Sequence, residues 1–371
     1  MGSQKLILMY YADSAPKEHR YADQAHALIA DLDDTTELNK LLFSQDTQLT
    51  PPPDKASHMS YGSLLFDDQR NELVFVTHAR INNVEGDNII RVWKIGPYLS
   101  LTSVEDTPLR YGGYPQQLGS IIEANSTNFG TSIKRNKDGQ DPFQHEIYRK
   151  GLDNKWISVP LRAMDYVEQG TTVTFVRCPQ SSKYIHYVTC TRDYHGEIDP
   201  LHVYSIGSRN FSEIATNDSI AWQHYRVYPG FSTGCGFTTH VTFNASQDAG
   251  RLYFIAPLGM RNIAFSYINV RKDCSIKSNS SEIQCLGKTV VPIPQGATGL
   301  SPHVVEWNGR VIILVPGLSD SFSAIVGQIG ADGSLPEAKD WRLIPVEFTS
   351  PVTKDALNFG GAAVVDSDFI D

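Results

Sequence analysis

The chain has 371 residues and a formal net charge of −9, from 32 Lys and Arg against 41 Asp and Glu. This acidic balance argues against nucleic-acid or anionic-membrane partners, which require a basic surface. The 17 Tyr and 16 Phe exclude a disordered chain, and no apolar run reaches the roughly 18 residues of a membrane-spanning helix.

Predicted strands begin close to the N-terminus, at residues 5–11 and 25–31. Residues 33–44 have the composition of a short helix, and the proline-rich stretch 49–54 is predicted to be a rigid connector. Residues 61–77 then predict a hairpin, because two apolar-alternating runs flank a polar turn. Further strands are expected at 89–95 and near 99–105.

This four-strand unit recurs along the chain. First strands are predicted at 62–66, 119–123, 172–176, 240–244, 303–307 and 361–365, so they start 57, 53, 68, 63 and 58 residues apart. Second strands are predicted at 130–133, 184–188, 251–255 and 310–315. Third strands are predicted at 145–148, 201–206, 264–268 and 323–328.

The sixth copy contains a first strand only, and the two N-terminal strands can complete it. A sheet built from both chain ends closes a ring and leaves no open edge. We therefore predict an all-β fold, a six-bladed β-propeller in a single domain. The expected blades are 59–113, 114–166, 167–230, 235–297 and 298–350, with 355–371 joined to 4–48. Two β-sandwiches are the alternative, but the Pro/Gly/Ser linker they need does not stand out mid-chain.

Cysteines and glycosylation sequons point to the secretory pathway. The close spacings predict two disulfides, Cys178 with Cys190 and Cys274 with Cys285, leaving Cys235 over. Asn-x-Ser/Thr sequons predict glycosylation at Asn125, Asn210, Asn217, Asn244 and Asn279. We interpret the Met1-Gly2-Ser3 start as a trimmed secretory N-terminus. Five reduced, buried thiols are the alternative to this interpretation.

Few catalytic motifs are present. Gly230 to Gly234 matches the G-x-S-x-G elbow, but a strand-to-helix turn is not expected around Ser232. Residues 136–141 lack the distal Glu of a calcium loop, and a hairpin tip is the simpler interpretation. P-loop, Rossmann and H-E-x-x-H motifs are absent, and no cofactor is expected.

The candidate site comes from topology. In a propeller, residues just before and at the start of each innermost strand surround one mouth of the central channel. This set combines aromatic walls with hydrogen-bonding groups, as small-molecule pockets do. Its members are His58, Tyr61, Tyr114, Gln117, Asp165, Tyr166, Glu168, Gln169, Thr238, Thr239, His240, Ser301, His303, Asn358 and Phe359.

Three interpretations remain open for His58, His240 and His303. Imidazoles that converge on one axis suit zinc or manganese. They also suit general acid–base catalysis or hydrogen-bond donation. The simplest alternative is that they line the channel. We take the histidines and Asp165 as candidate catalytic groups and expect no resident metal.

The length, blade layout and secretory start resemble the secreted fungal hetero-Diels–Alderases of tropolonic sesquiterpenoid biosynthesis. This resemblance implies dehydration of an alcohol to an ortho-quinone methide, followed by stereoselective cycloaddition with a terpene. A histidine or Asp165 would assist loss of water. The predicted substrate-binding residues are Tyr61, Tyr114, Gln117, Tyr166, Gln169, Thr238, Asn358 and Phe359, and the expected partner is a terpenoid or polyketide.

A different class of function is a lectin-like propeller with sugar sites between blades. Such lectins repeat a ligand signature in each blade, whereas these copies share only apolar alternation. A glycan hydrolase or lyase stands between the two classes, and paired carboxylates at the mouth would support it. Asp165 and Glu168 form such a pair on one loop. Oligomeric state is not predicted.

Overall fold

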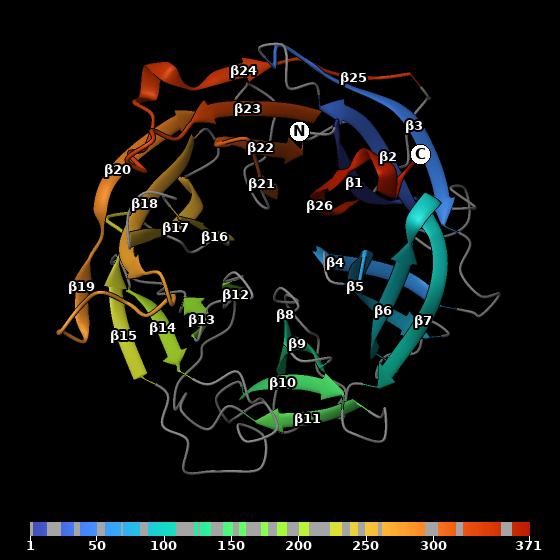
Figure 1. Ribbon diagram of the computed structural model, residues 1–371. Coiled ribbons are helices and arrows are strands. Elements are labelled where there is room, and N and C mark those ends of the chain that lie inside the picture. The colour runs from blue at the N-terminus through green and yellow to red at the C-terminus, as the bar shows by residue number, and fades with distance from the viewer. Residues whose placement is uncertain are drawn as a thin grey trace.

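The computed structural model is built almost entirely of strands. It describes residues 3–12, 24–32, 38–49, 56–67, 70–81, 88–108, 122–124, 127–134, 144–150, 156–160, 172–176, 184–190, 200–207, 223–231, 238–243, 249–258, 262–293, 303–316, 322–349 and 358–371, with side chains described for a subset of these. Within these ranges the strands form six sheets, arranged as a ring (Figure 1). Among the described residues, no helix is long and apolar enough to cross a membrane.

Both ends of the chain meet in one sheet. From the centre outward its strands are β26 (Asn358–Asp366), β1 (Gln4–Ala12), β2 (Gln24–Leu32), β3 (Leu41–Leu49) and β25 (Val346–Phe348). The C-terminal strand is therefore innermost and pairs with the N-terminal strand, as the sequence predicts. The helix considered over 33–44 is wrong for residues 41–44, because these begin β3.

The next two sheets follow in chain order and each has four strands. The first contains β4 (Ala56–Asp67), β5 (Glu72–Ile81), β6 (Asn88–Gly96) and β7 (Ser100–Pro108), with the 3-10 helix η1 (Pro97–Leu99) between the last two. The second contains β8 (Ile122–Ala124), β9 (Thr127–Lys134), β10 (Gln144–Lys150) and β11 (Trp156–Pro160).

Three further sheets complete the ring. One contains β12 (Thr172–Val176), β13 (Ile185–Cys190), β14 (Leu201–Ile206), β15 (Gln223–Tyr228) and β19 (Glu282–Gln284). The next contains β16 (Thr238–Phe243), β17 (Ala249–Leu258), β18 (Asn262–Arg271) and β20 (Leu286–Pro292). The last contains β21 (His303–Trp307), β22 (Arg310–Pro316), β23 (Phe322–Gln328) and β24 (Arg342–Ile344), and η2 (Ala338–Asp340) and η3 (Ser367–Phe369) are short 3-10 helices.

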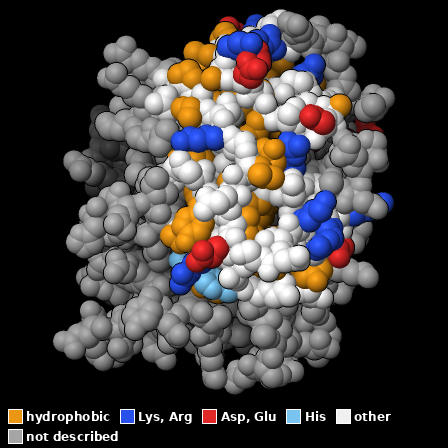
Figure 2. Space-filling view, turned by 90° about the vertical axis from the view of Figure 1, so that its left-hand side faces the viewer, with side chains coloured by type: hydrophobic (Ala, Val, Ile, Leu, Met, Phe, Trp, Pro, Cys, Tyr) orange, Lys and Arg blue, Asp and Glu red, His pale blue; other side chains and the backbone are white. Residues whose placement is uncertain are grey.

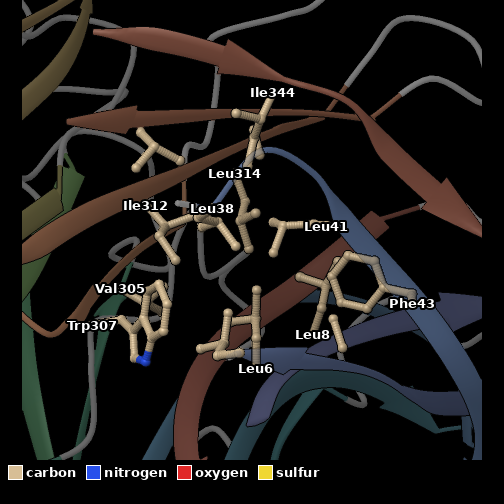
Figure 3. Close-up of a cluster of buried hydrophobic side chains, with 14 of the residues drawn as sticks. Leu6, Leu8, Leu38, Leu41, Phe43, Val305, Trp307, Ile312, Leu314 and Ile344 are labelled. Atoms are coloured by element: carbon tan, nitrogen blue, oxygen red, sulfur yellow. The ribbon is translucent and has the colours of Figure 1, made fainter. Parts of the chain in front are cut away.

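Apolar residues run without interruption from Leu6 to Met9 in β1 because both faces of the strand are covered. Ile7 and Met9 face a cluster shared with Phe75 of β5. Leu6 and Leu8 face the opposite cluster, where they meet side chains of β21 and β22 (Figure 3). Burial of each such Leu or Ile stabilises the fold by about 1.5–3 kcal/mol. Packing between blades thus holds the two chain ends in the ring.

Two outer sheet edges are covered by short strands that sequence patterns did not predict. β19 pairs in parallel with β15, and β25 pairs in parallel with β3. β19 comes from the connection between β18 and β20 of the neighbouring sheet, and β25 comes from the connection that follows β24. An unpaired edge invites pairing with another chain, so this cover protects the rim from aggregation. The described strands and their ring arrangement confirm the predicted all-β propeller fold.

Candidate functional site

The candidate site is the end of the ring at which the innermost strands begin, called the mouth end below. β26 contacts β4 on one side and β21 on the other, and β16 contacts β12 and β21. The innermost strands are therefore neighbours around the axis (Figure 1). Their first residues lie at one end because every sheet repeats the same order from the centre outward.

Most of the predicted mouth residues that the structure describes lie in the starting segments of innermost strands. His303 is the first residue of β21, and its side chain is partly buried. Of the following, the backbone alone is described: His58 and Tyr61 in β4, Thr238, Thr239 and His240 in β16, and Asn358 and Phe359 in β26. Outside the described residues lie Tyr114, Gln117, Asp165, Tyr166, Glu168, Gln169, Ser232 and Ser301.

Breaks in strand register occur at this end, and others occur in the pairs β2–β3, β6–β7 and β18–β20. In β4, Ser57 and Ser60 have partners in β5, and the pairing shifts between them and again before Gly62. His58 and Tyr61 occupy these two irregular positions. A bulge turns side chains away from the regular alternation, and bulges are over-represented next to active sites.

β26 carries a second irregularity at the same end. Its pairing with β1 shifts between Phe359 and Gly361, opposite Tyr10 and Met9. Regular antiparallel pairing then continues to Asp366. Two adjacent innermost strands therefore depart from ideal geometry where the sequence places candidate ligand-binding residues.

A row of hydrogen-bonded polar side chains on β1, β2 and β3, the strands outside β26, supports that innermost strand. The Tyr10 hydroxyl donates to Asp46 Oδ2 at 2.7 Å, and His26 Nδ1 lies 3.0 Å from Asp46 Oδ1. Burial raises the pKa of Tyr10, and its bond to Asp46 raises it further. Burial also acts to raise the pKa of Asp46, but its bonds to His26 and Tyr10 prevail and lower it. The carboxylate is therefore held in its charged form.

A comparable row stands behind β4. The Arg91 guanidinium, only 2% exposed, donates from Nε and from a terminal nitrogen to the two oxygens of Asp106 at 2.7 and 2.8 Å. Arg91 is opposite Thr77, and Thr77 is opposite Gly62, next to Tyr61. This two-point bond fixes the outer strands of the sheet and so steadies the segment that carries Tyr61.

Sequence reasoning missed both rows. A histidine within the apolar run of β2 and an arginine within that of β6 were the available signals. The aspartates that bind them lie on the next strand of each sheet, so these pairs could be identified only once the strand register was known. These side chains lie on strands outside the innermost strand of each sheet, and we assign them a supporting role.

No group of three His, Cys, Asp or Glu side chains suited to a metal ion occurs among the described residues. Since the side chains of His58 and His240 are not described, a metal interpretation of the three histidines stays untested.

The predicted disulfide between Cys274 and Cys285 is wrong. Cys285 is a free thiol, whereas Cys274 is disulfide-bonded to a sulfur outside the described side chains. The spacing suits a hairpin, but β19 leaves the sheet and pairs with β15, where the Cys285 amide donates to the Tyr228 carbonyl. Cys274 instead lies buried below His186, whose Nε2 donates to the Cys274 carbonyl at 2.5 Å.

The remaining predicted modifications are only partly described. Asn279 is exposed in the connection before β19, as an acceptor must be. Asn125, Asn210, Asn217, Asn244, Cys178 and Cys235 lie outside the described residues, as does the side chain of Cys190.

No family model and no curated protein sequence matches the chain. Among solved structures, it is similar to a GH43_1 enzyme from Xanthomonas citri complexed with xylotriose, with 13% identity, a TM-score of 0.45 and coverage of 81% of this chain and 93% of that one. It is also similar to an alpha-L-arabinanase from Penicillium chrysogenum complexed with arabinobiose, with 9% identity and a TM-score of 0.49. That match covers 85% of this chain and 90% of that one. A mutant of AofleA from Arthrobotrys oligospora has 12% identity to the chain and a TM-score of 0.45. That match covers 84% of this chain and 78% of that one.

Proposed function

We propose that this protein is a β-propeller enzyme that binds one uncharged organic molecule at the mouth end. The observation that carries this proposal is the coincidence of register breaks in β4 and β26 with Tyr61, His58 and Phe359. His303 begins a neighbouring innermost strand and adds an imidazole to the same end. Together these groups offer aromatic surface and proton-transfer capacity.

A single site is favoured over repeated sugar sites. β12 begins with Thr172, β16 with Thr238, β21 with His303 and β26 with Asn358. Equivalent lectin sites would need equivalent side chains in each sheet. Two of these strands start with threonine, but the other two start with histidine and asparagine, which suits one asymmetric site on the axis.

The first candidate reaction is the one implied by the resemblance to fungal hetero-Diels–Alderases. His58, His240, His303 or Asp165 would assist departure of water, and the resulting quinone-methide oxygen would accept a hydrogen bond from Gln117, Gln169 or Tyr61. Tyr114, Tyr166 and Phe359 would pack the terpene. Holding two reactants in near-attack geometry can supply about 7–11 kcal/mol of the barrier.

The second candidate is hydrolysis or elimination on a glycan. Asp165 and Glu168 supply the two carboxyl groups that most glycosidases use as acid and as nucleophile or base. Their role separates the candidates, because the cycloaddition requires only one acid and tolerates loss of Glu168.

Activity measurements on matched variants test both candidates. We expect His303→Gln to reduce turnover by about 10²- to 10⁴-fold, the usual contribution of a general acid or base. Tyr98→Asn is the control, because Tyr98 is 70% exposed in η1, away from the innermost strands, and asparagine tolerates its φ of 58°. The panel contains a quinone-methide precursor with a humulene-type alkene, and aryl glycosides of arabinose and xylose.

Each result has a defined meaning. Turnover of the precursor that survives Glu168→Gln supports cycloaddition, and glycoside cleavage that is lost in both Asp165→Asn and Glu168→Gln supports hydrolysis. Unchanged turnover in His58→Gln, His240→Gln and His303→Gln would contradict the proposed site.

We also propose secretion and glycosylation, supported by the exposed Asn279 and the disulfide at Cys274. Expression behind a signal peptide in a glycosylating host should give a protein that endoglycosidase makes lighter. Asn279→Gln and Ser281→Ala should each remove one glycan. An unchanged mass in both variants would show that this sequon is not used.

A further inference from the structure

Cys274 lies at the end of the ring opposite the mouth end, called the far end below. β16 begins at the mouth end, and its last residue, Phe243, is opposite Gly250 near the start of β17. Ala249, the first residue of β17, is opposite Arg271, the last residue of β18. The Cys274 amide donates to the Arg271 carbonyl at 2.8 Å, so Cys274 lies beside the far end of this sheet.

The partner of Cys274 belongs to the same chain. Cys274 is disulfide-bonded and fully buried, so a second copy of the chain cannot reach its sulfur. The described surface agrees, because on the side of the ring that carries β19 and β20 apolar side chains are intermingled with charged ones of both signs (Figure 2). Permanent interfaces between copies are more apolar than this. Since Cys285 is a free thiol, the remaining candidates are Cys178, Cys190 and Cys235.

A hydrogen bond between neighbouring sheets favours Cys178. His186, on β13, donates from Nε2 to the Cys274 carbonyl at 2.5 Å. Val176, the last residue of β12, is directly opposite His186, and such pairs have Cα atoms about 4.5–5.5 Å apart. The chain therefore leaves β12 at the far end, close to the turn that contains Cys274. Cys178 follows Val176 by two positions, which span at most about 7 Å.

Cys190 lies at the mouth end of the same strand pair. It is the last residue of β13, about 13 Å along the strand from His186. In the register it is opposite Thr172, with which β12 begins. Disulfides join residues whose Cα atoms are usually about 4.4–6.8 Å apart. A bond from Cys190 to Cys178, which sequence spacing predicts, would require the chain to turn back along β12.

Cys235 is also tied to the mouth end by its place in the sequence. It precedes Thr238, the first residue of β16, by three positions. Thr238 is opposite Ile255, which lies about 20 Å along β17 from Ala249 at the far end. Three residues span at most about 10 Å, so Cys235 cannot come within bonding distance of Cys274.

We propose that Cys178 and Cys274 form a disulfide that joins two adjacent sheets at the far end of the ring. These sheets already share a buried apolar cluster, to which Val188 contributes from one sheet and Leu252 and Phe254 from the other. The bond closes a loop of roughly 100 residues, a length for which the chain-entropy model gives stabilisation near the upper end of the usual range.

Formation of this bond requires an oxidant. The two thiols lose two protons and two electrons, and a protein disulfide of the secretory pathway accepts them and becomes a dithiol. This step rests on the secretion proposed above. In a reducing compartment the same two cysteines would remain thiols.

Peptide mapping of the full-length, secreted and deglycosylated protein tests the proposal. Trypsin cleaves after Lys and Arg, so it places the five cysteines in separate peptides: 178–183, 184–192, 227–251, 273–277 and 278–288. Free thiols are alkylated before digestion, because a thiolate would otherwise exchange with the disulfides. Peptides 178–183 and 273–277 should be joined before reduction and separate after it.

Serine variants provide a matched comparison. Cys178→Ser and Cys274→Ser should each lower the melting temperature by about 3–6 °C, the shift expected for loss of a disulfide in a chain of this length. The double variant should lower it no further, because both substitutions remove the same bond. Cys285→Ser is the control, since it removes the free thiol and should keep the two peptides joined.

Two outcomes would overturn the proposal. The first is wild-type protein in which peptide 273–277 is joined to 184–192 or to 227–251. The second is a Cys178→Ser variant in which Cys274 still resists alkylation after denaturation. Failure of secretion is distinguished from both, because retained protein that is refolded with oxidised glutathione should give the same joined peptides.

Discussion

The Lys5 ammonium donates a hydrogen bond of 2.8 Å to Oδ1 of Asp371, so the first strand of the ring is tied to the last residue of the chain. Lys5 Nζ also lies 3.4 Å from Asp31 on β2. The bond to Asp371 raises the pKa of Lys5 against the opposing effect of its burial. Because this pKa is raised, the stabilisation is present at neutral pH and is lost as the pH rises beyond about 10.5.

We predict that Asp371→Asn lowers the free energy of unfolding by about 0.2–1 kcal/mol at pH 7, because Asp371 is exposed and the pair is screened by solvent. Urea unfolding measures the difference. Asp368→Asn removes the same charge from an exposed position and should change little. An equal loss in both variants would assign the effect to net charge rather than to the tie.

Gly361 allows β26 to approach β4. A Cβ placed at this glycine would lie 2.7 Å from both the backbone nitrogen and Cβ of Leu64. We predict that Gly361→Ala costs about 1–3 kcal/mol, the range for overpacked interiors, and lowers the melting temperature. Ala362→Ser, at the next and partly buried position, should stay within about 0.5 kcal/mol. Equal melting temperatures for Gly361→Ala and wild type would show that the innermost strands can separate without cost.

Alternation and spacing predicted most of the ring, because each strand buries residues on a repeating period. Residues 303–307 and 172–176 were predicted with the bounds that β21 and β12 have. β19 and β25 were not predicted, because each has only three residues, too few for an alternating pattern to be recognised. Their pairing also depends on a strand of a neighbouring sheet.

The candidate site was less accessible to sequence reasoning. Strand starts located His303 and Phe359, but the bulges beside His58 and Phe359 leave no pattern in the sequence. The Tyr10–Asp46 bond joins residues 36 positions apart, and only the pairing of β1, β2 and β3 brings them together. The disulfide predicted from cysteine spacing was wrong for the same reason, because the chain between Cys274 and Cys285 forms β19, which pairs with a strand of another sheet.

His186 gives the protein a pH-dependent stability. Complete burial lowers its pKa to about 4, although the bond from Nε2 to the Cys274 carbonyl acts in the opposite direction. A histidine whose folded pKa lies below 6.5 stabilises the native state fully above pH 6.5, and this contribution is lost as the pH falls toward 4.

We therefore predict that stability declines across this window by up to about 1.4 kcal/mol per pH unit from this group. Chemical unfolding of His186→Gln, which keeps a donor, should show a flatter profile between pH 6.5 and 4. Tyr184→Phe retains the ring that stacks near His186 and should parallel wild type. Parallel profiles for His186→Gln and wild type would contradict the assignment.

The two described cysteine side chains should differ in reactivity. In the native protein the Cys285 thiol should resist alkylation, because burial raises its pKa to about 12 and the thiolate is the reactive form. In denatured but unreduced protein, Cys285 should alkylate while Cys274 stays protected. Peptide mapping should link Cys274 to Cys178. A Cys274–Cys285 peptide in unreduced digests would contradict the connectivity, and alkylation of both after denaturation alone would mean that Cys274 is reduced.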